Sequence, residues 1–216
     1  MPGKVKAWSY SRLSTYEICP AKIGYGVVAG IKEPQNAAMA RGSDIHKKGE
    51  NYLAKGGRVP AEYKPLAEEM RALRKLKPVV EGKWCFTKRW KETGWFDRDA
   101  WVRLVMDVFA RMGTYARIID FKTGKVRDEN MGQLSLYALA VFHRYPDITK
   151  VTAELWYVDH GIIRTKDFDR SEMDDLTRDW TKRAKPLLND MKFVPTPNFL
   201  CQWCFFSKEK GGPCKY

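Results

Sequence analysis

Residues 117–125 read R-I-I-D-F-K-T-G-K, and the rest of the chain is organised around this stretch. Its isoleucines and Phe121 suit a buried strand, and T-G-K then ends that strand in a turn. Side chains alternate along a strand, so Asp120 and Lys122 lie on one face. Two charges on such a face are costly unless they are paired, bind a metal or take part in catalysis. Taken alone, the stretch still favours a plain salt bridge.

The composition indicates a folded and basic protein. The 216 residues are 44% hydrophobic and 13% aromatic, enough for one sizeable core. A net charge of +13, from 39 Lys and Arg against 26 Asp and Glu, indicates a polyanionic partner, most simply nucleic acid and otherwise an acidic membrane surface. The sequence has no long apolar run and no signal peptide, so we expect no membrane span and a cytoplasmic protein of a bacterium or phage-infected cell.

The hydrophobic period predicts a mixed α/β domain. Helices are expected at 8–19, 37–54, 65–77, 130–145 and 171–191. From residue 83 the period becomes that of strands, with short connections. This change predicts an antiparallel meander and a later hairpin, with strands at 83–90, 99–110, 114–122, 151–158 and 161–168.

A second acid joins the opening stretch. Asp107 ends the second predicted strand, and a tight turn around Gly113 leads to the strand of Asp120, so the two carboxylates can lie side by side. Two close acids repel and normally recruit a divalent cation, for which oxygen ligands favour magnesium or manganese. Lys122 can then orient or help deprotonate a water and offset transition-state charge. This set is what metal-assisted phosphodiester hydrolysis requires.

The pattern Asp107…Asp120-Phe121-Lys122 resembles the D…D-x-K core of the PD-(D/E)xK nuclease superfamily. More narrowly, the chain resembles the RecB-like branch, with its AddB-type nucleases and its iron–sulfur nucleases of CRISPR adaptation. Residues 41–46, R-G-S-D-I-H, resemble the R-G-x-x-x-H helix of that branch, and residues 133–137, Q-L-S-L-Y, resemble its Q-x-x-x-Y motif. The resemblance implies a restriction-endonuclease-like α/β fold, with a mixed central sheet flanked by helices.

The resemblance also implies a role for each matching residue. His46, Asp107 and Asp120 would hold Mg²⁺ or Mn²⁺, with the backbone carbonyl of Phe121 as a further ligand. Lys122 would serve the attacking water.

Further residues of these motifs are candidate substrate contacts. Gln133 and Tyr137 share a helix face and would complete the catalytic set while positioning DNA. Arg41 is a candidate phosphate contact, or alternatively a brace for an acid of the site. We expect Glu50 to be a helix-surface charge rather than a ligand.

The cysteines form a second constellation. Cys201 and Cys204, followed by Cys214, make a soft-metal half-site, and Cys19 is the natural fourth ligand. Four thiolates suit either a 4Fe-4S cluster or tetrahedral zinc, and the resemblance favours the cluster. Free thiols or a disulfide are the alternative. Either metal would join the N- and C-terminal segments, whereas Cys85 is expected to be a buried strand residue.

We therefore predict one nuclease domain over residues 1–216: N-terminal helices at 8–77, core sheet and helices at 83–191, and a Cys-rich tail at 192–216 docking on Cys19. The expected activity is a metal-dependent deoxyribonuclease. The resemblance suggests an exonuclease on single-stranded DNA or free ends, acting in recombination, repair or phage DNA processing, with a helicase or a recombination or adaptation protein as candidate partner. The alternatives are a non-catalytic nucleic-acid-binding or assembly subunit and, third, a nuclease acting on RNA.

Overall fold

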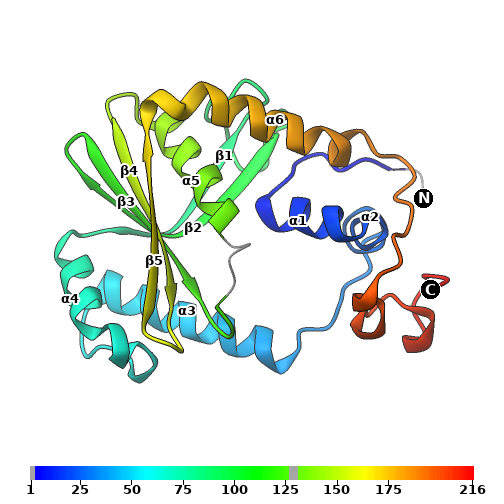
Figure 1. Ribbon diagram of the computed structural model, residues 1–216, viewed down its shortest axis with the longest axis horizontal. Coiled ribbons are helices and arrows are strands. Elements are labelled where there is room, and N and C mark those ends of the chain that lie inside the picture. The colour runs from blue at the N-terminus through cyan, green and yellow to red at the C-terminus, as the bar shows by residue number, and fades with distance from the viewer. Residues whose placement is uncertain (1–2, 127–130) are drawn as a thin grey trace.

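The computed structural model describes residues 3–126 and 131–216, and within them the strands form a five-stranded sheet in the order β1-β2-β3-β4-β5 (Figure 1). The strands are β1 Val79–Phe86, β2 Val102–Met112, β3 Tyr115–Lys122, β4 Lys150–Tyr157 and β5 Ile162–Asp169. The α-helices are α1 Tyr10–Ile18, α2 Pro20–Ile23, α3 Ala37–Lys55, α4 Ala67–Lys75, α5 Met131–Arg144 and α6 Met173–Asn189.

The sheet is mixed. Strands β1, β2 and β3 pair antiparallel, β3 pairs parallel with β4, and β4 pairs antiparallel with β5. Gly113 has a φ of 62° in the short turn between β2 and β3, a conformation that glycine adopts without steric cost. Helix α5 carries the chain from β3 to its parallel neighbour β4, because parallel strands need a crossover connection. The predicted meander, hairpin and mixed α/β fold are confirmed.

Helices cover both faces of the sheet. Helices α5 and α6 lie on one side of it, and α3 and α4 lie on the other (Figure 1). The core beneath α5 contains Ile118 of β3 and Leu155 of β4. The core beneath α3 and α4 contains Ile119 and Phe121. Alternate residues of β3 therefore serve opposite cores, as strand geometry requires.

The helices begin and end near the predicted residues. Ser9 caps α1 by accepting the Arg12 amide at 3.3 Å, and Asn36 caps α3 in the same way. The helix predicted at 65–77 is shorter, because a 3₁₀ turn, η2 Ala61–Leu66, precedes α4. The predicted start of α5 at Asn130 lies outside the described residues. No helix in the described part of the chain is long and apolar enough to cross a membrane.

Strand β1 differs from its prediction at both ends. It begins at Val79, earlier than expected, and ends at Phe86. The residues after Phe86 form a turn in which the Thr87 hydroxyl accepts the amides of Arg89 and Lys91. Trp90 has a φ of 57° in this turn. The side-chain acceptor and the left-handed residue stop the strand, although the apolar alternation continues to Trp90.

Side-chain alternation along β2 reverses at Asp107. Leu104 and Met106 face the core beneath α5, whereas Val108 faces the core beneath α3 and α4. The β1–β2 register places Glu81 across from Asp107, between the pairs Val80–Val108 and Gly82–Met106. Glu81 has a φ of 50°, in the left-handed region that few residues with side chains adopt. The sheet is thus irregular at the strand position that carries the first acid.

The C-terminal segment has no long element. It contains two short 3₁₀ turns, η5 Phe199–Trp203 and η6 Lys208–Lys210. The segment lies beside α1, α2 and the π-helical turn η1 Gly24–Val28, although these regions are far apart in the sequence (Figure 1). Cys19 and residues of this segment line one pocket.

Candidate active site

Asp107 lies where β2 and β3 separate. The pairing of β2 with β3 runs from Met112–Tyr115 to Val108–Ile119 and stops there. One position further, Asp107 would lie opposite Asp120. The Asp107 Oδ2 atom instead accepts the backbone N–H of Phe121 at 2.7 Å. The carboxylate thus satisfies an amide donor of β3 at the gap, and this bond holds the acid in place.

His46 reaches the same carboxylate from α3. Its Nδ1 atom lies 3.2 Å from Asp107 Oδ2, and its ring meets the Phe121 ring edge-on with centroids 5.9 Å apart. Burial works to lower the pKa of His46, but the hydrogen bond and charge of Asp107 outweigh it and raise the pKa above its ordinary value. A metal ligand must be the neutral imidazole, so a bound cation would displace this proton.

A glycine lets α3 approach the sheet closely enough for this contact. A Cβ atom on Gly49 would lie within 2.6 Å of the Tyr63 Cζ and 3.1 Å of a Phe121 ring carbon. Tyr63 is fully buried here and donates its hydroxyl to the Ile45 carbonyl at 3.2 Å. The packing of Gly49 therefore sets the distance between the helix of His46 and the strand of Asp120.

Asp120 is the most buried charge of the site, at 3% exposure. Lys122 Nζ lies 2.5 Å from its Oδ2 atom and forms an ion pair with it. Burial raises the Asp120 pKa to about 6, with the negative charge of Asp107 adding to the effect and Lys122 opposing it. A buried carboxylate beside a second carboxylate is a position that a cation stabilises.

Lys122 belongs to a chain of hydrogen bonds that ends on β2. Its Nζ donates to Gln133 Oε1 at 2.9 Å, and Gln133 Nε2 donates to the Tyr137 hydroxyl at 2.5 Å. Tyr137 in turn donates to the Val105 carbonyl at 2.8 Å. The predicted shared face of Gln133 and Tyr137 is confirmed. Because Tyr137 is buried and its hydroxyl is occupied on both sides, its visible effect is to fix Gln133 and hence Lys122.

Two further acids line the pocket of Asp107. This open pocket, of about 690 Å³, is also lined by His46, Glu50 and Glu81. Glu50 is 6% exposed, and burial followed by the charge of Glu81 raises its pKa, with Lys47 opposing. The prediction of a surface charge at Glu50 is wrong. Glu50 lies one helical turn after His46, and that spacing was the sequence signal for a shared face.

Arg41 lies apart from the carboxylates. Its guanidinium forms a two-pronged pair with Asp159, at 3.0 Å and 2.5 Å. Asp159 also accepts the Gly124 amide at 2.7 Å, and His160 Nε2 lies 2.9 Å from the Gly124 carbonyl. Arg41 thus joins the start of α3 to the turn that follows β3. The acid that Arg41 braces is Asp159, not Asp107 or Asp120, so the phosphate contact and the brace of a site acid both stay predictions.

The donor set of the site fits a hard divalent cation by its chemistry. Asp107 and Asp120 offer carboxylate oxygens, and His46 offers an imidazole nitrogen beside Asp107. Within residues 3–126 and 131–216, however, no three His, Cys, Asp or Glu side chains are close enough to form a ready-made metal site.

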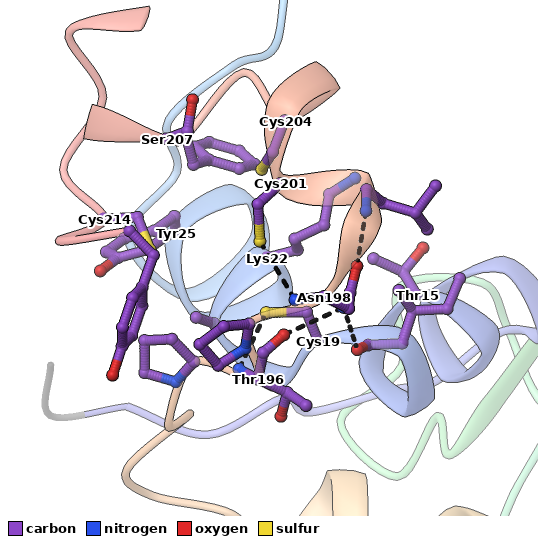
Figure 2. A pocket seen from close by; sticks show the side chains of 17 residues that line it. Thr15, Cys19, Lys22, Tyr25, Thr196, Asn198, Cys201, Cys204, Ser207 and Cys214 are labelled. Carbon is purple, nitrogen blue, oxygen red and sulfur yellow. Dashed lines mark hydrogen bonds between the residues drawn. The ribbon is translucent and has the colours of Figure 1, made fainter. Parts of the chain in front are cut away.

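The four predicted cluster ligands line one pocket (Figure 2). Cys19 comes from the end of α1, and Cys201, Cys204 and Cys214 come from the C-terminal segment. Backbone amides of Thr196 and Asn198 donate to the sulfurs of Cys19 and Cys201, each at 3.4 Å. The enclosed space is about 90 Å³. Among the described residues these cysteines, like the acids, do not form a ready-made metal site. Cys85 is buried in β1 as predicted.

The fold and the site define a class, that of nucleases with a mixed sheet carrying two acids and a lysine. Residues 93–208, more than half of the chain, match the family model of the PD-(D/E)XK nuclease superfamily. The protein belongs to this superfamily, as predicted. Members of the superfamily generally use Mg²⁺ or Mn²⁺. The narrower assignment to the RecB-like iron–sulfur branch stays a prediction.

Two solved structures resemble the fold. A provisionally assigned exonuclease from Eubacterium rectale is 16% identical, with a TM-score of 0.52 over 92% of this chain and 87% of that chain. The protein SSO0001 is 14% identical, with a TM-score of 0.47 over 98% of this chain and 87% of that chain. At 16% identity, the first of these structures shows a shared fold alone. No curated protein sequence matches the chain significantly.

Proposed function

We propose that this protein is a Mg²⁺- or Mn²⁺-dependent deoxyribonuclease that acts as an exonuclease on single-stranded DNA. The observation that carries the proposal is the buried Asp120 carboxylate, which lies beside Lys122 and shares its site with a second acid. That second carboxylate, Asp107, lies across the strand gap. A structural salt bridge needs no second acid.

His46, Asp107 and Asp120 would hold the cation, with the Phe121 carbonyl as a further ligand. When bound, the cation supplies Lewis acidity at the phosphate and lowers the pKa of a water molecule. The protein keeps Asp107 in place through the Phe121 amide and keeps Asp120 away from solvent. A cation would also favour the ionised form of Asp120, which burial disfavours in its absence.

Lys122 serves the attacking water and the charge that develops on the phosphate. Its ammonium lies between Asp120 and the Gln133 side chain, so its position is fixed before substrate arrives. A positive charge held this way needs little reorganisation in the transition state. Gln133 and Tyr137 maintain that position from α5 and would contact the DNA strand through the same side chains.

The wider proposal follows the charge and the fold. A net charge of +13 favours DNA as the polyanion, and the resemblance to the RecB-like branch suggests single strands or free ends as substrate. We further propose that residues 1–216 act as one nuclease domain in the cytoplasm, in recombination, repair or phage DNA processing. A helicase or a recombination or adaptation protein is the candidate partner.

We also propose that the four cysteines bind a 4Fe-4S cluster that fastens the C-terminal segment to α1. Their arrangement around one pocket, with amide donors directed at two sulfurs, supports this assignment. Zinc is the alternative ligand. Protein purified without oxygen is expected to be brown, with broad visible absorption and about stoichiometric iron and sulfide. Colourless protein that contains zinc would contradict the cluster and support the zinc site.

The nuclease proposal is tested with end-labelled single-stranded DNA, with Mg²⁺ or Mn²⁺ and with EDTA. Cleavage is expected only with the metal, and Asp120→Ala and Lys122→Ala should each abolish it. A matched control is the ion pair of Lys150 and Asp167, 2.8 Å apart on the same sheet, whose alanine variants should cleave normally. Cleavage that survives Asp120→Ala and Lys122→Ala contradicts the proposal. DNA binding without any metal-dependent cleavage supports a binding subunit instead.

A further inference from the structure

A second cavity lies beside the candidate active site. Its volume is about 300 Å³, and Gln133 and Tyr137 form part of its wall. Val105 lines both this cavity and the pocket of Asp107. The remaining wall comes from the start of α1, the connection between β1 and β2, and β2 itself: Ser9, Tyr10, Ser11, Arg12, Trp95, Arg103 and Leu104.

The cavity contains two arginines without an acidic partner. Neither Arg12 nor Arg103 forms an ion pair with a carboxylate of the described residues, and Arg103 Nε is buried without a hydrogen-bond partner there. Arg12 donates Nη1 to the Ala7 carbonyl at 2.7 Å, which anchors it at the wall. Partial burial, followed by the like charge of Arg103, lowers the pKa of Arg12. Two cations held together in this way are stabilised by an anion.

The N-terminus of α1 adds to the positive electrostatic potential that Arg12 and Arg103 create in the cavity. Ser9 caps this nine-residue helix, and Ser9 and Ser11 bring hydroxyls 3.0 Å apart to the cavity wall. The first amides of a helix carry partial positive charge, which favours an oxyanion in front of them. Arginines, hydroxyls and a helix start together are the groups that bind phosphate.

One aromatic side chain lies against Arg103, and a second follows it in the sequence. The guanidinium carbon of Arg103 lies 5.6 Å from the centroid of the Trp95 ring, and Trp95 lines the cavity. The adjacent Phe96 is 89% exposed, an unusual position for a large apolar side chain. Exposed aromatic rings next to cationic groups are the usual platform for bases of single-stranded nucleic acid.

We propose that this cavity is a phosphate subsite for the DNA strand, beside the phosphate that is cleaved, with Trp95 and Phe96 stacking bases. The inference rests on the proposed nuclease function and adds where the strand lies. Val105 lines both cavities, and Gln133, which lines this one, accepts a hydrogen bond from Lys122 of the acid site, so one strand can occupy both. The bound group is a phosphate oxyanion, which comes either from an internal diester or from a strand end.

The test measures binding of a fluorescent single-stranded oligonucleotide in EDTA, where cleavage does not intervene. The Arg12→Gln/Arg103→Gln variant is expected to bind about tenfold more weakly, the scale of one lost charged contact. Its log–log salt slope should shrink by about 0.7, the value for one phosphate on a single strand. The control Arg71→Gln/Arg178→Gln removes the same charge from two exposed helix positions and should bind nearly as the wild type does.

A second variant guards against misfolding. Ser11→Asp places an acid in the first turn of α1, which favours the helix but repels a phosphate in the cavity. It should keep the wild-type melting temperature and still bind DNA about tenfold more weakly. Ser14→Asp makes the same charge change farther along α1, outside the cavity wall, and should bind normally.

Three substrates distinguish the source of the phosphate: a 5′-phosphorylated strand, a 3′-phosphorylated strand and an unphosphorylated strand. Loss of affinity on all three indicates an internal diester, and loss on one phosphorylated strand alone indicates that end; both support the subsite. Equal affinity of Arg12→Gln/Arg103→Gln and its control on every strand overturns it. Metal-dependent cleavage by wild type with an unchanged KM in that variant rejects the subsite and keeps the nuclease. If the variant binds DNA more weakly but the wild type shows no metal-dependent cleavage, the subsite is kept and the nuclease proposal is rejected.

Discussion

Two groups of side chains are ordered in different ways: the acid pocket, meaning His46, Asp107 and Asp120, and the cysteine pocket, meaning Cys19, Cys201, Cys204 and Cys214. Asp107, Asp120 and His46 stand on two strands and a helix of the core, and a backbone amide holds the first acid. Three of the four cysteines stand on a segment whose longest element is a five-residue 3₁₀ turn. Backbone bonds such as Cys214 N–H to the Phe206 carbonyl, at 2.9 Å, hold that segment locally.

The difference teaches where each pocket obtains its geometry. Packing on both faces of the sheet positions the acids, so their arrangement exists before a cation binds. The cysteine segment leaves Phe199 and Trp203 exposed and buries Phe193 and Phe206. If the proposed cluster is bound, the order of this segment should depend on it. Four changes test this contrast, from the largest expected effect to the smallest.

Removing the charge of Asp120 should separate activity from stability. Asp120→Asn is expected to reduce cleavage by about 10³-fold, within the range for loss of a catalytic group. Burial raises the Asp120 pKa to about 6, so the ionised form destabilises the metal-free fold above that pH. The variant should therefore gain about 1–2 kcal/mol of unfolding free energy in EDTA at pH 8 and nothing at pH 4. A loss of stability at pH 8 would contradict the pre-formed acid pocket.

Removing one thiol should give the opposite result. Cys201→Ser is expected to lower metal content and to cost about 3 kcal/mol of unfolding free energy, the scale for releasing one long loop. Cleavage by the remaining folded protein should be largely kept, because the acids stand on the core. Cys85→Ala, which removes a buried thiol of β1, should leave metal content unchanged. Full metal content in Cys201→Ser shows that the tail does not depend on that ligand.

Loss of the Tyr137 hydroxyl should affect Lys122 at a distance. Tyr137→Phe removes the bonds to Gln133 and Val105 and keeps the ring. Cleavage should fall about tenfold, equivalent to one hydrogen bond of about 1.4 kcal/mol. Tyr145→Phe is the control, because the contacts of Tyr145 are made by its ring, which stacks on Phe109. Unchanged kcat and KM in Tyr137→Phe mean that Lys122 is positioned without it.

The smallest effect concerns pH. His143 stacks on Trp90 with centroids 5.0 Å apart, and burial followed by the charge of Arg170 lowers its pKa to about 4. The unfolded chain therefore binds a proton that the fold rejects, and stability is lost as pH falls from 6.5 to about 4. Allowing for solvent screening, the loss is about 1 kcal/mol in urea titrations. His143→Gln should abolish this step, whereas His160→Gln in the exposed β4–β5 turn should retain it.

Much of the sheet could be predicted because its signals are local. Alternating apolar residues and the short turn at Gly113 were enough to place Asp107 and Asp120 on adjacent strands. The alternation of β2 gave no sign that it reverses at Asp107. That reversal coincides with the left-handed backbone of Glu81 on another strand, and hydrophobic period alone does not report it.

The missed residues of the site depend on contacts between distant segments. Glu50 is buried because α3 packs on the sheet through Gly49, a consequence of the Tyr63 and Phe121 rings rather than of helix period. Arg12 meets Arg103 only after α1 docks beside β2. Neither arginine stands in a recognisable motif, so a sequence could show their charge but not their proximity.

The hydrogen bond from the Phe121 amide to the Asp107 carboxylate makes one backbone proton a reporter of the site. A cation that binds the Asp107 carboxylate withdraws electron density from Oδ2 and so weakens the hydrogen bond that the Phe121 amide donates to it. The nitrogen chemical shift and the hydrogen-exchange rate of this single residue should therefore follow metal occupancy, without a label, a substrate or a turnover. The signal of this amide would therefore allow metal binding to be titrated without DNA, which a nuclease would degrade during the measurement.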